Sequence, residues 1–340
     1  MAPRPARPYH EHVHRLRGIA ILGVVSTHVV SVLGERLTGP VATVFYVLFG
    51  EGSPIFLMIS GFLFRETLVR YRYPRFIKRK AKNVLVPYLV ISIPALVVYI
   101  GGFKQSHPWL SDSFLHENPV LQLIVFLVTG AHLGPLWFVP MILLFFIVSP
   151  VFAMVDRRPW LYLSIIPLTA LTVLVPRPHL NSDPLQSFVH FCSLFVIGMC
   201  LARYHDRLIN SFARHRAIYL TVGLVAVALL AALASGSHAF DSLSRGAFGL
   251  YLVFVLHTWR GIGPAGLVLD KLGEASFPIF FLHGYPVAGF RALSLDGQLG
   301  APAWLALWGV VMVTTTLVTA AFAFGMRALL GARSRYVIGM

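Results

Sequence analysis

The chain has 340 residues, of which 57% are hydrophobic and only 12% charged, and its mean hydropathy is +0.74. A soluble domain of this length carries about twice that fraction of charge, so the composition excludes an ordinary water-soluble protein. Lysine and arginine outnumber aspartate and glutamate by 28 to 13; we ascribe this excess to membrane topology and anionic lipid, and expect no nucleic-acid partner because no soluble domain is present to read a groove.

We expect residues 1–14, rich in proline, arginine and histidine, to form a disordered basic tail, followed by one all-helical transmembrane domain over 15–330 and a short cytoplasmic tail over 331–340. The first apolar run is expected to remain as an anchor, and no hydrolase-like domain is expected after the last span. Windows of about 20 apolar residues predict ten membrane spans, at 16–34, 41–64, 83–103, 134–155, 159–175, 184–203, 217–234, 243–259, 275–291 and 303–327.

The basic residues predict how these spans are oriented. With both termini in the cytoplasm, 23 of the 28 basic residues lie inside, as expected for a multi-pass protein of the inner (cytoplasmic) membrane. The apolar run at 119–130 is too short to span and is expected to be re-entrant or interfacial. Counting it as a span would also move the basic clusters 157–158 and 203–216 outside. The five basic residues left outside are Arg36, Lys104, Arg177, Arg245 and Arg291.

The first span contains an arginine and a histidine on one helix face, in the sequence RGIAILGVVSTH. Arg17 and His28 are eleven residues apart, which places them about 20° apart around the helix and roughly 16 Å apart along it. An ionisable group near the middle of a bilayer costs several kcal/mol, so this pattern indicates a functional site. A neutral imidazole that bridges two helices remains the alternative.

A lone acid, Glu51 in FGEGSPIF, lies at similar depth in the next span. Either it orients or charge-stabilises His28, or it caps the helix break made by the glycines and proline at 50–54. Ser60 and Trp137 are hydrogen-bonding neighbours within the spans, and we expect them to contact substrate.

A basic segment follows the second span. Eight cations lie within the eighteen residues 65–82, which favours either a lipid-binding patch or a site for the phosphates of coenzyme A, since arginine makes bidentate contacts to phosphate. The sequence HEHVH at 10–14 has alternate spacing on a segment expected to be flexible, so it predicts no fixed tetrahedral geometry and we expect no metal. Motifs of serine hydrolases, zinc proteases and phosphate-binding loops are missing from the sequence.

Five segments in order resemble the membrane-bound acyltransferase 3 family, whose members O-acylate surface polysaccharides and other exported acceptors. They are RLRGIAILGVVSTH with its Arg-x10-His signature, SPIFLMISGFLF, FIKRKAKNVLVPY, GPLWFVPMILLFFIVSP and GEASFPIFFLHGYP. The resemblance runs from residue 15 to residue 286. It implies that His28 is catalytic, that Arg17 helps hold an acetyl-CoA donor, and that His283 lies near substrate, although phenylalanine and leucine precede it where the family often has tyrosine.

The family's Arg-x-x-Arg pattern in the basic loop falls on Arg72 and Arg75, or on Arg79 with Lys82 as a departure from the pattern. The resemblance implies transfer of an acyl group, most often acetyl, to a carbohydrate or lipid-linked acceptor, with membrane lipid and polysaccharide-synthesis or export proteins as further partners. The alternative is an exporter of a glycan or lipid-linked sugar, because polar groups midway along the spans also suit transport.

Overall fold

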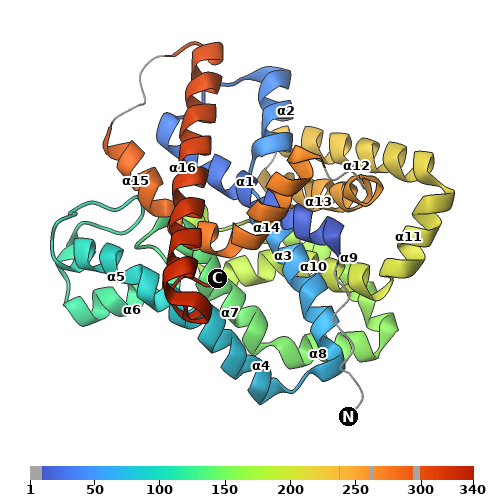
Figure 1. Cartoon of the computed structure of the whole chain (residues 1–340), viewed down its shortest axis with the longest axis horizontal. Helices are drawn as coiled ribbons and strands as arrows, with labels where there is room; N and C mark the ends of the chain where they lie inside the picture. The colour runs from blue at the N-terminus through green and yellow to red at the C-terminus, as the bar shows by residue number, and fades with distance from the viewer. Residues whose placement is uncertain (1–9, 237, 260–262, 294–298) are drawn as a thin grey trace.

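The computed structural model describes residues 10–236, 238–259, 263–293 and 299–340, and these form helices and connecting loops without a β-strand. The prediction of an all-helical fold is therefore confirmed (Figure 1). The α-helices are α1 Glu11–Leu33, α2 Gly39–Phe49, α3 Ser53–Thr67, α4 Tyr73–Lys80, α5 Val86–Ile100, α6 Pro119–Thr129, α7 Phe138–Ile147, α8 Ser149–Arg157, α9 Ile165–Leu174, α10 Pro184–Arg203, α11 His205–Arg214, α12 Arg216–Gly236, α13 Asp241–Thr258, α14 Pro264–Leu282, α15 Gly284–Ala292, α16 Ala301–Leu330 and α17 Ser334–Val337.

Six helical segments of the described chain are long and apolar enough to cross a membrane. The apolar run at 119–130 forms α6, which joins Gly134–Ile147 at a bend of 71° as a broken span or a re-entrant loop, and would make a seventh. The predicted count of ten is not confirmed. The six segments are Glu11–Leu33, Gly39–Arg70, Tyr73–Ile100, Pro184–Arg203, Arg216–Ser235 and Ala301–Val337.

Two of the predicted spans are broken into shorter helices. The segment 134–155 ends its first helix at Ile147, because Pro150 lacks the N–H that a continuous helix would need there. The segment 275–291 divides at His283 into α14 and α15. Polar side chains lie buried at these breaks, Ser149 at the first and His283 at the second.

Two other predicted spans form helices that are too short or too polar to cross a membrane. The segment 243–259 lies in α13, whose first turns carry Asp241 and Arg245 and lower its hydropathy. The segment 159–175 consists of a 3-10 turn followed by α9, which is only ten residues long.

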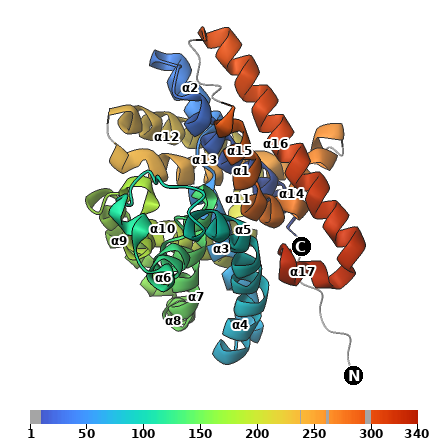
Figure 2. The same ribbon diagram turned by 90° about the vertical axis from the view of Figure 1, so that its left-hand side faces the viewer.

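The centre of the bundle is α1, which packs against α3, α13, α14, α15 and α16, while α16 and the α11–α12 pair lie on opposite flanks (Figures 1 and 2). Small residues allow the close approach, as is usual between membrane helices. A Cβ added at Gly18 would lie 2.6 Å from the carbonyl oxygen of Leu269, and one at Gly23 would lie 2.6 Å from that of Gly50. The short segment between α2 and α3 therefore packs directly on α1.

We expect Gly52→Ala to destabilise the protein by about 1–3 kcal/mol or more, because overpacking against backbone has no flexible neighbour to move. The new Cβ would lie 1.9 Å from the carbonyl oxygen of Ala20 on α1. The measurement is thermal unfolding of the detergent-solubilised protein. Gly309→Ala on α16, where no atom lies within 4 Å of the added Cβ, is the matched control and should be neutral or stabilising. Equal stability of the two variants would contradict the close packing of α1 on this segment.

Ion pairs join several charged segments at the end of the bundle where α1 begins. The guanidinium of Arg15 donates to both carboxylate oxygens of Asp270, at 3.1 and 3.3 Å. Asp156 is contacted by Arg65 at 3.5 Å and by Arg203 at 3.1 Å. Segments that the charge distribution predicts on one side of the membrane thus meet at one end of the bundle.

Candidate active site

Two imidazoles from distant parts of the sequence lie together near the other end of α1. His28 comes five residues before α1 ends at Leu33. His283 joins α14 to α15 and is completely buried. The two ring centroids are 5.1 Å apart. The pairing of these two residues, placed 255 positions apart, could not be derived from either motif alone.

The hydrogen bonds of His283 indicate its tautomer. Its Nδ1 lies 2.8 Å from the carbonyl oxygen of Ile279, and a nitrogen facing a carbonyl must carry the proton and donate. The Nε2 is then the lone-pair nitrogen, and it is buried without a hydrogen-bond partner among the described residues. His283 therefore keeps an unsatisfied acceptor next to the ring of His28.

His28 also faces a small cavity of about 60 Å³. This volume accommodates a few water molecules or a small organic group. Gly134 lies against the ring of His28, since a Cβ added there would lie 3.4 Å from its Cε1. The cavity is lined by Val24, Thr27, His28, Glu51, Ser53, Trp137, Arg177 and Asn181.

Glu51 binds Arg177 across this cavity. The Arg177 guanidinium makes a bidentate contact, with Nη1 donating to Oε2 and Nη2 donating to Oε1 at 2.7 Å. Its guanidinium carbon also lies 4.9 Å from the ring centroid of Trp137, close enough for a cation–π interaction. Both carboxylate oxygens of Glu51 thus accept hydrogen bonds from Arg177. Glu51 lines the same cavity as His28.

The loop between α9 and α10 places Arg177 at this point. Nδ1 of His190 lies 2.8 Å from the carbonyl oxygen of Val175 and anchors the start of the loop, which gives His190 a structural role. Asn181 accepts a hydrogen bond from Nε of Arg177. Leu180 and Asn181 have φ angles of 50° and 57°, in the left-handed region that is costly for side chains other than glycine. Such strain persists only where surrounding contacts enforce it, and it is common at functional sites.

The remaining predicted residues are not at the cavity. The Ser60 hydroxyl donates to the Phe56 carbonyl oxygen at 2.8 Å, within α3. Arg17 is partly buried on α1, about 16 Å from His28 along the helix. The structure thus brings together His28, Glu51, Trp137 and His283, and separates them from Ser60 and from the basic positions. The basic-loop positions Arg72, Arg75, Arg79 and Lys82 are all exposed, in or next to α4 and the π-helical turn Ala81–Leu85.

The sequence model of an acyltransferase domain matches residues 13–325, which include every residue that lines the cavity. The chain belongs to the acyltransferase 3 family. No curated protein and no solved structure matches it. The resemblance found in the sequence is therefore confirmed, and with its several apolar helices the chain is a multi-pass membrane acyltransferase.

Sequence reasoning missed Arg177 and Asn181 in this acyltransferase. It counted Arg177 only as one of five basic residues outside the predicted cytoplasmic segments. The position of Arg177 could have indicated its role. It lies between Pro176 and Pro178 in a short loop on the predicted outer side, whereas most basic residues of the chain lie on the predicted cytoplasmic side.

The cavity of this acyltransferase combines the groups that acyl transfer requires. A neutral imidazole can remove a proton from an attacking hydroxyl, and a fixed cation can stabilise the negative charge that develops on the carbonyl oxygen. An imidazole, that of His28, and a guanidinium, that of Arg177, both line this cavity. Because the Asn181 oxygen accepts from Arg177, its NH₂ group is the one left to donate to a ligand.

Proposed function

We propose that this acyltransferase moves an acetyl group from cytoplasmic acetyl-CoA to a hydroxyl of a carbohydrate or lipid-linked acceptor outside the inner membrane. The pairing of His28 with His283 beside the cavity is the observation that carries the proposal. The cavity volume of about 60 Å³ supports a small acyl group over a long chain. Membrane lipid surrounds the bundle, and polysaccharide-synthesis or export proteins would deliver or remove the acceptor.

In the direct mechanism, His28 removes the proton of the acceptor hydroxyl while its oxygen attacks the thioester carbonyl. The carbon–sulfur bond then breaks, and the coenzyme A thiolate leaves and takes up the proton held by His28. Arg177 stabilises the oxyanion of the tetrahedral intermediate. In the alternative, an imidazole nitrogen of His28 attacks the thioester carbonyl, the carbon–sulfur bond breaks and the coenzyme A thiolate leaves. The acceptor hydroxyl then attacks the acyl-imidazole, the carbon–nitrogen bond breaks, and the hydroxyl proton passes through the released imidazole to the thiolate.

The donor is proposed to enter from the end of the bundle where α1 begins, which then faces the cytoplasm together with both termini. Arg15 binds Asp270 at this end, and the resemblance to the family assigns contact with the donor to Arg17. The exposed basic segment around α4 would bind the phosphates. The roughly 16 Å between Arg17 and His28 suits a donor whose charged head and thioester lie far apart.

The test compares surface glycans by mass spectrometry in cells with and without the protein, together with coenzyme A release by the purified protein in vesicles. We expect an ester-sized mass difference on the glycan and release of coenzyme A that depends on the acceptor. Export of glycan without coenzyme A release would instead support the transporter considered from the sequence.

A further inference from the structure

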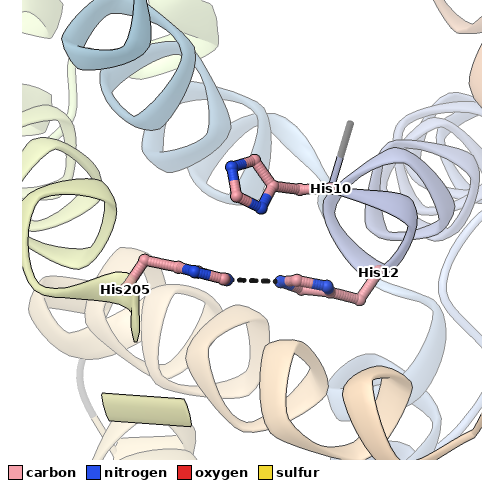
Figure 3. Close-up of side chains that lie close together, drawn as sticks. All are labelled: His10, His12 and His205. Atoms are coloured by element: carbon pink, nitrogen blue, oxygen red, sulfur yellow. Dashed lines mark hydrogen bonds between the residues drawn. The ribbon is translucent and has the colours of Figure 1, made fainter. Parts of the chain in front are cut away.

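Three histidines meet at the end of the bundle opposite the cavity. His10 directly precedes α1, His12 lies in its first turn, and His205 is the first residue of α11 (Figure 3). One nitrogen from each ring can be chosen so that all three lie within 4.8 Å of one another. None of the three lines the cavity at His28, so the proposed acyl transfer does not account for them.

Neighbouring side chains orient both nitrogens of the His205 ring. Its Nδ1 lies 3.0 Å from a carboxylate oxygen of Asp206 and must donate to it. Its Nε2, the nitrogen left for a metal ion, lies 3.1 Å from Nε2 of His12. A carboxylate that orients the outer nitrogen of a histidine is the usual arrangement around a metal-binding imidazole.

The surroundings of His10 favour its neutral form. Burial and the neighbouring His205 lower the pKa of His10, and a neutral imidazole is the form that binds metal. Phe62 packs edge-on against His10 and forms an apolar wall. A carboxylate oxygen of Glu66 lies 3.9 Å from Nε2 of His10. His257 packs against His12 with ring centroids 5.3 Å apart.

We propose that His10, His12 and His205 bind a zinc ion, with the Glu66 carboxylate or a water molecule as the fourth ligand. Zinc–nitrogen bonds of about 2.1 Å require ligand nitrogens roughly 3.4 Å apart in a tetrahedron. The separation of 3.1 Å between His12 and His205 is already close to this value. Since two ligands come from the start of α1 and the third from the start of α11, the ion would hold the first turn of α1 against the α10–α11 junction.

The test is zinc content. The full chain is purified in detergent with a tag that contains no histidine, equilibrated with zinc, desalted and analysed by mass spectrometry of the metal. We expect about one zinc per chain in the wild type, and at least tenfold less in His12→Ala and His205→Ala. His215→Ala, an exposed histidine at the end of α11, is the matched control and should retain zinc. Lack of zinc in the wild type, or equal zinc in all variants, would overturn the proposal.

A second measurement covers variants that fail to fold. Asp206→Asn leaves all three ligands in place and should weaken zinc binding about tenfold in a competition titration. His28→Ala should bind zinc as the wild type does, which separates this site from the imidazole pair at the cavity. Chelation should lower the Tm of the wild type, and added zinc should restore it. If Asp206→Asn bound zinc normally, or if zinc left the wild-type Tm unchanged, the assigned geometry would be wrong.

Discussion

Replacing His28 with alanine is expected to lower acetyl transfer by about 10²–10⁴-fold, because the reaction then lacks the group that takes the proton of the acceptor hydroxyl. His28→Gln retains a polar side chain of similar size that cannot act as a base, so it should be equally inactive. The rate is measured as coenzyme A release and as transfer of labelled acetyl from acetyl-CoA. Size-exclusion chromatography and thermal unfolding should show that both variants remain folded.

Normal transfer by His28→Ala would eliminate both the direct route and the acyl-histidine route. His283 has a different expected role, because its lone-pair nitrogen can only accept a hydrogen bond beside His28. His283→Gln should reduce kcat less than His28→Ala and should shift the pH dependence of kcat/KM. A merely structural role for His283 would lower the yield of folded protein without moving the pH profile.

Arg177→Met is expected to destabilise the protein by about 3 kcal/mol, because it leaves the carboxylate of Glu51 unpaired inside the protein. The side chain of Arg177 is 26% exposed and that of Glu51 is 19% exposed, so the expected loss of stability is near the lower limit for a buried ion pair. Adding Glu51→Gln to Arg177→Met removes the unpaired charge and should recover much of the loss. The measurement is the free energy of unfolding of both single variants and the double variant in one detergent.

The control for this cycle is the exposed pair of Arg327 with Glu274, whose side chains are 50% and 34% exposed. Arg327→Met should cost less than about 1 kcal/mol, as surface ion pairs contribute little. Additive effects of Arg177→Met and Glu51→Gln would contradict the pairing seen across the cavity. Acetyl transfer should be lost in Arg177→Met and in the double variant, because the double variant recovers stability but still lacks the cation.

Much of the membrane domain follows from local sequence properties. The apolar run after Arg17 predicts α1, and the glycines and proline at 50–54 predict the break between α2 and α3. The breaks at Ile147 and His283 are less evident, because the hydropathy of those windows is high and each fragment is stable only through packing by its neighbours.

The site divides in the same way. His28 was identified because a histidine deep in an apolar run is costly, and Glu51 by the same argument. Arg177, His205 and His283 reach their partners only because helices distant in the sequence pack together. The spacing of residues within one segment does not predict which distant helix will lie beside it. The sequence HEHVH lacks a complete metal site for this reason: one ligand lies almost 200 residues away, and His14 instead contacts the carbonyl oxygen of Asp270.

The distance in sequence between His28 and His283 has a consequence for biosynthesis. A ribosome that has inserted α1 through α13 into the bilayer has delivered His28, Glu51 and Arg177, while the second imidazole is still unmade. In the mechanism that we propose, a nascent chain at this stage lacks the completed pair, so acyl transfer begins only after α14 and α15 have been made.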